Sequence, residues 1–205
     1  MQMKSSKRVA DNTHTNTTRN TTYTGKENIF NRPNIVSFSR VPLLLIAVYL
    51  ILTGFDPQIS ASIIILIFLL DLADGYIARK FGEETEFGKV ADEMVDRIIE
   101  NVLFIVFACL AYIPVWAPII MIMRAIIVDT LTPQYKRKET AAYKRLIRSD
   151  LSRGGYGFLK MLLFAGLVFY PSLSADYQHA MLWLTVLVVF FSVFRGLAKL
   201  REIGR

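Results

Sequence analysis

The chain has 205 residues, 53% of them hydrophobic, and a formal net charge of +7 at pH 7. Its mean hydropathy of +0.39 indicates one small integral membrane domain rather than several soluble ones. The positive charge does not indicate nucleic-acid binding, because the basic residues flank apolar segments and form no recognisable nucleic-acid module. Anionic lipid headgroups are the simpler partner.

The first segment, residues 1–28, is polar and rich in Asn and Thr. It lacks the apolar run of a secretory signal, so we expect a disordered polar tail. The remainder, residues 29–205, is predicted to form a single membrane domain.

Six apolar segments follow the tail, each close to the length of about 20 residues that a helix needs to cross a bilayer. The predicted spans are 34–54, 59–80, 88–112, 115–132, 155–173 and 178–200. The sequence therefore predicts an all-α integral membrane protein with six transmembrane helices.

The basic residues predict how these helices are oriented. Lys and Arg are absent from the turns around 55–57, 112–114 and 172–179, whereas they gather at both termini and in the other connections. Because connections rich in Lys and Arg stay in the cytoplasm, we expect both termini to be cytoplasmic. The cytoplasmic membrane is the expected location.

Two pairs of aspartates lie at the end of the second predicted span and the start of the third. Asp71 and Asp74 are three residues apart, and Asp92 and Asp96 are four apart, so each pair shares one helix face. An ionised group at membrane depth is costly unless it faces a polar cavity or a partner. Since carboxylates suit Mg²⁺, and paired ions assist phosphoryl displacement, the four aspartates are predicted metal ligands.

Small residues and one arginine stand between the two aspartate pairs. Gly75 costs a helix about 1 kcal/mol relative to Ala, which suggests that something approaches its backbone closely. Ala78 follows one turn later, Arg79 can neutralise a diphosphate, and Gly88 lies at the start of the next helix. A nucleotide diphosphate would fit these features.

Together these residues form the pattern D-x-x-D-G-x-x-A-R, eight residues, then G-x-x-x-D-x-x-x-D. This stretch resembles the CDP-alcohol phosphotransferase family, in which the glycines, the alanine and the arginine line the cytidine diphosphate pocket. The resemblance implies a membrane catalytic domain that uses two divalent cations, Mg²⁺ or Mn²⁺. Such an enzyme moves a phosphatidyl-type group from a CDP-linked lipid to a hydroxyl acceptor and releases CMP. On this reading Asp96 also acts as the general base.

The entry to the first span, P-N-I-V-S-F-S-R at 33–40, is similar to a segment of the same family whose polar residues face the nucleotide and phosphates. Asn34, Ser37 and Arg40 are therefore further site candidates. Asn and Ser also cap helices, and an arginine near a helix end can extend to lipid headgroups. Both interpretations stay open.

Cations in or beside the later spans are candidates for binding the acceptor. Arg124 lies inside an apolar run, where a charged residue is a functional candidate by default. An acceptor that carries its own phosphate would suit such cations, while positive-inside topology is the alternative for most of them. The candidates are Arg124, Arg148, Arg153, Lys160 and Arg195. Asp129 could pair with a neighbouring base, and Glu100, one turn after Asp96, could either support the aspartate site or form a core ion pair.

The acceptor is expected to be a phosphorylated polyol, such as glycerol 3-phosphate or inositol phosphate, ahead of serine or another small alcohol. The segment from Asp92 to Arg97 departs from the D-P-x-x-D-K form of the glycerol phosphate branch, so the identity of the acceptor stays open. So does the choice between a diacyl and an ether-linked, archaetidyl lipid. Family resemblance also allows a homodimer.

Two other classes of protein would account for part of the pattern. A divalent-cation transporter also places carboxylates among membrane helices, but it has no need of Gly75, Ala78 and Gly88 beside an arginine. A noncatalytic scaffold would keep the pocket with a damaged aspartate set, whereas all four aspartates are present. Nucleotide binding would distinguish the transporter from the transferase.

Overall fold

The computed structural model describes the backbone of residues 32–81, 86–134 and 150–201. Side chains are described within these ranges except at 32–34, 74–81, 86, 89, 132–134 and 150–153. In this part of the chain all regular secondary structure is helical. The helices are α1 Arg32–Leu52, α2 Pro57–Phe81, α3 Glu86–Cys109, α4 Trp116–Gln134, α6 Asp150–Val168 and α7 Ala175–Arg201, with a short 3₁₀ helix, η1, at Tyr170–Ser172.

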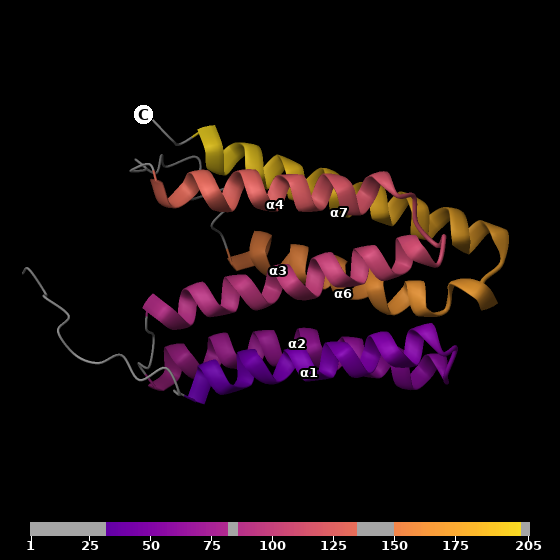
Figure 1. Ribbon diagram of the computed structural model, residues 1–205, viewed down its shortest axis with the longest axis horizontal. Helices are drawn as coiled ribbons and strands as arrows, with labels where there is room; N and C mark the ends of the chain where they lie inside the picture. The colour runs from indigo at the N-terminus through magenta and orange to yellow at the C-terminus, as the bar shows by residue number, and fades with distance from the viewer. Residues whose placement is uncertain (1–31, 82–85, 135–149, 202–205) are drawn as a thin grey trace, which may run out of the picture.

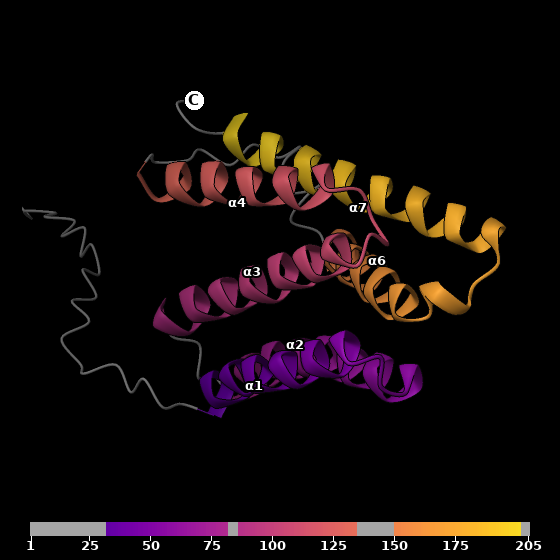
Figure 2. The same cartoon turned by 45° about the vertical axis from the view of Figure 1, so that its right-hand side comes forward.

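Two pairs of long helices form the outer sides of the bundle, with two further helices between them (Figure 1). α1 packs along α2, α4 packs along α7, and α3 and α6 lie between these two pairs. The turned view keeps the same order, with α3 between α1 and α4 (Figure 2). Because α3 contacts both outer pairs, its polar residues can meet partners on either side.

Each long helix overlaps one predicted span, and the largest difference concerns the fifth. The predicted span 155–173 is observed as α6, which begins earlier, at Asp150, and ends at Val168. Pro171 lies in the following 3₁₀ turn. Proline has no N–H for the α-helical hydrogen-bond ladder, so the α-helix ends before it and the chain turns into α7.

The hydrophobic core gathers where α2, α3 and α6 meet. The Phe164 ring packs edge-on against Phe104, with 5.1 Å between ring centroids, and stacks beside Phe68 and Phe107 at 6.2 Å. Aromatic pairs in these geometries add to the free energy of burial. Through Phe164 this aromatic core joins α6 to both α2 and α3.

Large apolar side chains also cover the outside of the bundle. Trp183 is 71% exposed and Phe190 65% exposed, and similar residues point outward from every long helix. By length and composition, two described helical segments could cross a membrane, Ile35–Leu52 and Ala175–Arg201, while Pro57–Ala73 and Gly154–Val168 are shorter apolar segments. The architecture is consistent with a membrane protein. Six spans and cytoplasmic termini stay predictions.

Candidate functional site

Three of the predicted metal ligands meet at the contact between α2 and α3. Asp71 comes from α2, and Asp92 and Asp96 lie one turn apart on α3. One carboxylate oxygen from each residue lies within 4.8 Å of the others. Their side chains are 30%, 43% and 36% exposed, respectively, so the group is open on one side. One carboxylate of the α2 pair and both carboxylates of the α3 pair therefore converge.

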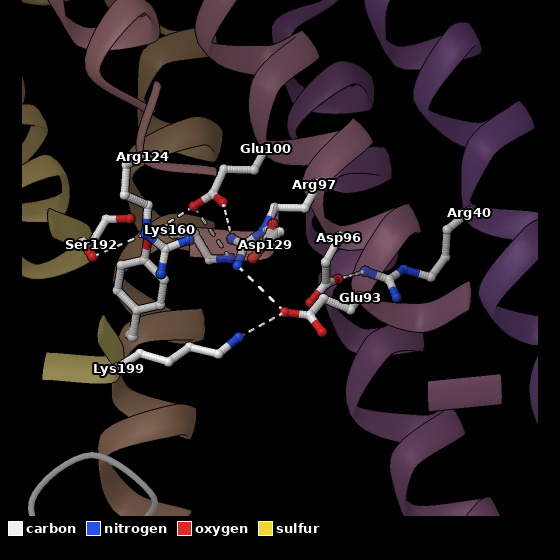
Figure 3. Close-up of polar contacts among 11 residues, drawn as sticks. Arg40, Glu93, Asp96, Arg97, Glu100, Arg124, Asp129, Lys160, Ser192 and Lys199 are labelled. Carbon is white, nitrogen blue, oxygen red and sulfur yellow. Dashed lines mark hydrogen bonds and ion pairs between the residues drawn. The ribbon is translucent and has the colours of Figure 1, made fainter. Parts of the chain in front are cut away.

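A buried arginine from α1 lies among these carboxylates. Nη1 of Arg40 donates to Asp71 at 2.7 Å and to Asp92 at 3.3 Å. Its Nη2 donates to Asp96 at 2.5 Å (Figure 3). The Arg40 side chain is only 1% exposed. Arg40 therefore lies in the aspartate site and does not extend to lipid headgroups. Its contact with a nucleotide or phosphate stays a prediction.

The turn between α1 and α2 brings Arg40 to the level of Asp71. Gly54 has a φ of +66°, in the left-handed region that favours glycine at the end of a helix. Its N–H donates to the Ile51 carbonyl at 3.2 Å. This turn folds α2 back along α1, so side chains equally far from the turn face each other.

This donor set fits a divalent cation. Carboxylate oxygens are the ligands that hard ions prefer, and here three such oxygens lie within 4.8 Å of one another. The side chain of the fourth predicted ligand, Asp74, lies outside the described residues, although its backbone is helical in α2. Its role stays a prediction.

The predicted nucleotide residues are described only in part. Gly88 lies in the first turn of α3, and Ser37 is 4% exposed on α1, three residues before Arg40 and so on the same face. The side chains of Asn34, Ala78 and Arg79, like residue Gly75, lie outside the described part, which gives only their helical backbone. A cytidine diphosphate pocket at these positions stays a prediction.

A second polar cluster begins one turn further along α3, at Glu100. This carboxylate is 2% exposed. It accepts hydrogen bonds from the Tyr156 hydroxyl at 2.7 Å and from Arg97 Nη1 at 3.1 Å, and Lys160 Nζ lies 3.6 Å away (Figure 3). Glu100 thus joins α3 to α6 through buried, charge-assisted contacts.

Arg97 carries this cluster across to α4. Its Nε donates to Asp129 at 2.9 Å, and its Nη2 forms a longer ion pair with Glu93 at 3.8 Å. Lys199 near the end of α7 also pairs with Glu93, at 3.4 Å. The expected pairing of Asp129 with a base is confirmed. The α3 helix that carries Asp92 and Asp96 is therefore held by ion pairs to four neighbouring helices, α1, α4, α6 and α7.

Three of the five predicted acceptor residues gather at this cluster. Lys160 is 8% exposed, and its ammonium lies 4.8 Å from the centre of the Tyr156 ring. The Arg195 guanidinium lies 5.5 Å from the same ring. Arg124 Nε donates to the Ser192 carbonyl at 3.2 Å, and its buried Nη1 has no hydrogen-bond partner within the described part of the chain.

The other two acceptor candidates cannot be placed in the same way. Arg148 lies outside the described residues, and for Arg153 the structure describes only the helical backbone in α6. Conversely, sequence reasoning did not select Arg97 or Tyr156 as site residues. Their positions gave some signal, because Arg97 follows Asp96 directly and Tyr156 is one turn before Lys160.

Comparison with known proteins gives a consistent family. A family model described as CDP-alcohol phosphatidyltransferase matches residues 30–192. The chain is similar to the CDP-diacylglycerol–inositol 3-phosphatidyltransferase of Schizosaccharomyces pombe, with 36% identity over 39% of this chain and 32% of the relative. It is also similar to the CDP-diacylglycerol–glycerol-3-phosphate 3-phosphatidyltransferase of Bacillus subtilis, with 28% identity over 50% of this chain and 61% of the relative.

A longer match involves the protein of the same name from Salmonella choleraesuis, which is 25% identical over 84% of this chain and 96% of the relative. The matches to the Schizosaccharomyces pombe and Bacillus subtilis relatives cover less than two thirds of those proteins' lengths. These relatives differ in the acceptor that their names give, inositol in one case and glycerol 3-phosphate in the others.

Proposed function

Because the chain belongs to the CDP-alcohol phosphatidyltransferase family, we propose that it transfers a phosphatidyl-type group from a CDP-linked lipid to the hydroxyl of an acceptor, with release of CMP. The observation that carries this proposal is the convergence of Asp71, Asp92 and Asp96, whose oxygens lie within 4.8 Å of one another. A cluster of carboxylates of this kind can hold the divalent ions on which many phosphoryl transfers depend.

The four motif aspartates, with Asp74 completing the set, would hold two divalent cations, Mg²⁺ or Mn²⁺. When bound, such ions stabilise the charge that develops on the attacking and leaving oxygens. Asp96 would take the proton from the acceptor hydroxyl, since it is the most C-terminal of the four and the nearest along α3 to the Glu100 cluster. The acceptor oxygen then forms a bond to the lipid-linked phosphorus, and the bond from that phosphorus to CMP breaks. Arg79 would offset the negative charge left on CMP.

The charges of the second cluster support a phosphorylated acceptor. Cations outnumber carboxylates among its described residues. The cations are Arg97, Arg124, Lys160, Arg195 and Lys199, and the carboxylates are Glu93, Glu100 and Asp129. Buried charge without compensation is costly. A phosphate on the acceptor would balance this excess and give the buried Nη1 of Arg124 an oxygen to contact. Serine or an uncharged alcohol would leave the excess in place.

The positions of the two clusters also support placing the metal ions at the aspartates and the acceptor phosphate at the second cluster. Asp96 and Glu100 lie on successive turns of α3, with Arg40 on one side and the cations of α4 and α6 on the other (Figure 3). An acceptor whose phosphate contacts the cations could therefore present a hydroxyl near Asp96. The basic connections support an orientation in which this site faces the cytoplasm.

The test is CMP release by the purified full-length chain in detergent, with CDP-diacylglycerol and Mg²⁺ or Mn²⁺. Glycerol 3-phosphate, inositol phosphate, inositol and serine are compared as acceptors, and an ether-linked CDP-lipid is tested in parallel. We expect release that depends on a phosphorylated acceptor and stops with EDTA. Absence of CMP release with every acceptor and both lipids would overturn the proposal, and Mn²⁺ binding without nucleotide binding would then favour transport.

A further inference from the structure

Arg40 and a divalent cation would use the same carboxylates. The two terminal nitrogens of Arg40 contact one oxygen each of Asp71, Asp92 and Asp96, at 2.7, 3.3 and 2.5 Å. The same three residues are those that could ligate an ion together. The guanidinium therefore lies inside the proposed metal site and not beside it.

The planar guanidinium is suited to hold these carboxylates together. Its donors form a rigid fork that can contact several oxygens at once, whereas a lysine ammonium is a compact point charge. Its single positive charge neutralises only part of the charge on three carboxylates, and the site stays open enough for their side chains to be 30–43% exposed. A divalent ion would bring more charge to the same oxygens, but it would also be repelled by Arg40.

Arg40 has little room to leave the site. Its side chain is 1% exposed, and α1, which carries it, packs against both α2 and α3. The guanidinium must therefore remain near the aspartates when ions bind, with some of its donors released from them. In this position the released donors could contact an anionic ligand of the site.

We propose that Arg40 is a positioning residue that competes with divalent cations: it holds Asp71, Asp92 and Asp96 together in the ion-free protein and gives up part of these contacts when ions bind. This inference rests on the metal site of the proposed function. It assigns Arg40 two consequences that can be measured without turnover, namely stability of the ion-free protein and weaker ion binding.

The experiment compares the full-length protein with Arg40→Gln, both purified in Mn²⁺ and then exchanged. Mn²⁺ affinity is measured from the electron paramagnetic resonance signal of free Mn²⁺, and the midpoint of thermal unfolding is recorded in EDTA and in Mn²⁺. In Arg40→Gln we expect a lower midpoint in EDTA, a larger rise on adding Mn²⁺, and a Kd for Mn²⁺ lower by about tenfold, because one positive charge leaves the site.

Two further variants make the result specific. Lys199→Gln removes one positive charge that pairs with Glu93 and touches none of the three aspartates, so its Kd for Mn²⁺ should stay close to that of the unchanged protein. Arg40→Lys keeps the charge but cannot hold three carboxylates, so its Kd should lie between those of the unchanged protein and Arg40→Gln. If Arg40→Gln does not fold, the Kd of Arg40→Lys for Mn²⁺ serves as the test instead.

Equal or weaker Mn²⁺ binding by both Arg40 variants would overturn the inference while leaving the metal site intact. If the unchanged protein itself bound no Mn²⁺, the metal site of the proposed function would fail, and the role of Arg40 with it. The two failures are distinguishable, because the first requires Mn²⁺ binding by the unchanged protein and the second excludes it.

Discussion

The Tyr156 hydroxyl donates a 2.7 Å hydrogen bond to Glu100, joining α6 to the middle of α3. Both partners are largely shielded from solvent, and Glu100 is also paired with Arg97 and Lys160. A buried carboxylate with three partners fixes the relative position of the helices that supply them. This contact therefore links the aspartate helix to the cations proposed for acceptor binding.

Replacing Glu100 should damage both stability and acceptor binding. In Glu100→Gln the cations Arg97 and Lys160 lose a buried carboxylate, so we expect the free energy of unfolding to fall by about 3 kcal/mol. Tyr156→Phe removes one hydrogen bond and should cost about 1 kcal/mol. Both values are obtained from unfolding in detergent at matched Mn²⁺. A loss in Tyr156→Phe as large as in Glu100→Gln would show that the ion pairs contribute little.

Asp96→Asn tests the general base. The amide cannot accept the proton from the acceptor hydroxyl, so we expect kcat to fall by about a hundredfold or more, while part of the CMP binding is kept. CMP release and CMP binding are measured on the same preparation. Glu93→Gln is the control on the same helix, since its side chain is 54% exposed and lies outside the aspartate group; its kcat should change little. Comparable losses in both variants would remove Asp96 as the base.

Arg124→Ala tests the acceptor cations. Loss of a charge-assisted contact to an acceptor phosphate should raise the KM for the acceptor by about tenfold or more and leave the KM for the CDP-lipid nearly unchanged. The exposed Arg201 at the end of α7 provides the control variant Arg201→Ala. An unchanged acceptor KM together with a lower unfolding midpoint would make Arg124 a structural residue.

Gly196→Ala tests whether the position of Arg124 matters, without removing its charge. A Cβ at Gly196 would lie 3.0 Å from Arg124 Nε and 3.0 Å from Val128 Cγ2, so the arginine must shift and its 3.2 Å bond to the Ser192 carbonyl must change. We expect the KM for the acceptor to rise several-fold.

The matched control for Gly196→Ala is Gly155→Ala in α6. A Cβ at Gly155 would meet nothing within 4 Å, and both substitutions favour the helix equally. The acceptor KM of Gly155→Ala should stay unchanged. If the two alanine variants had the same acceptor KM, close packing of α7 on Arg124 would be irrelevant to acceptor binding.

Much of the architecture follows from local sequence. A run of about 20 apolar residues forms a helix wherever backbone groups must satisfy their own hydrogen bonds, so the long helices that the structure describes lie close to the predicted spans. The motif spacings place Asp71 and Asp74 on one helix face, and Asp92 and Asp96 on another. Residue types and intervals predicted a carboxylate site, and the resemblance of the motif to a known family predicted the family to which the chain belongs.

The partners across helices could be identified only from the tertiary structure. Arg40 is 56 residues from Asp96 in the chain, and Tyr156 is 56 residues from Glu100. Helical periodicity specifies which side chains share one helix face, but contacts between helices also depend on how each helix is rotated and how far it is shifted along its neighbour. Those two quantities are set by the packing of the whole core, including the Phe164 cluster and the Gly54 turn. For this reason the sequence by itself determined the helices and the aspartate pattern, whereas the tertiary structure decided that Arg40 lies among the aspartates and that Glu100 gathers the cations.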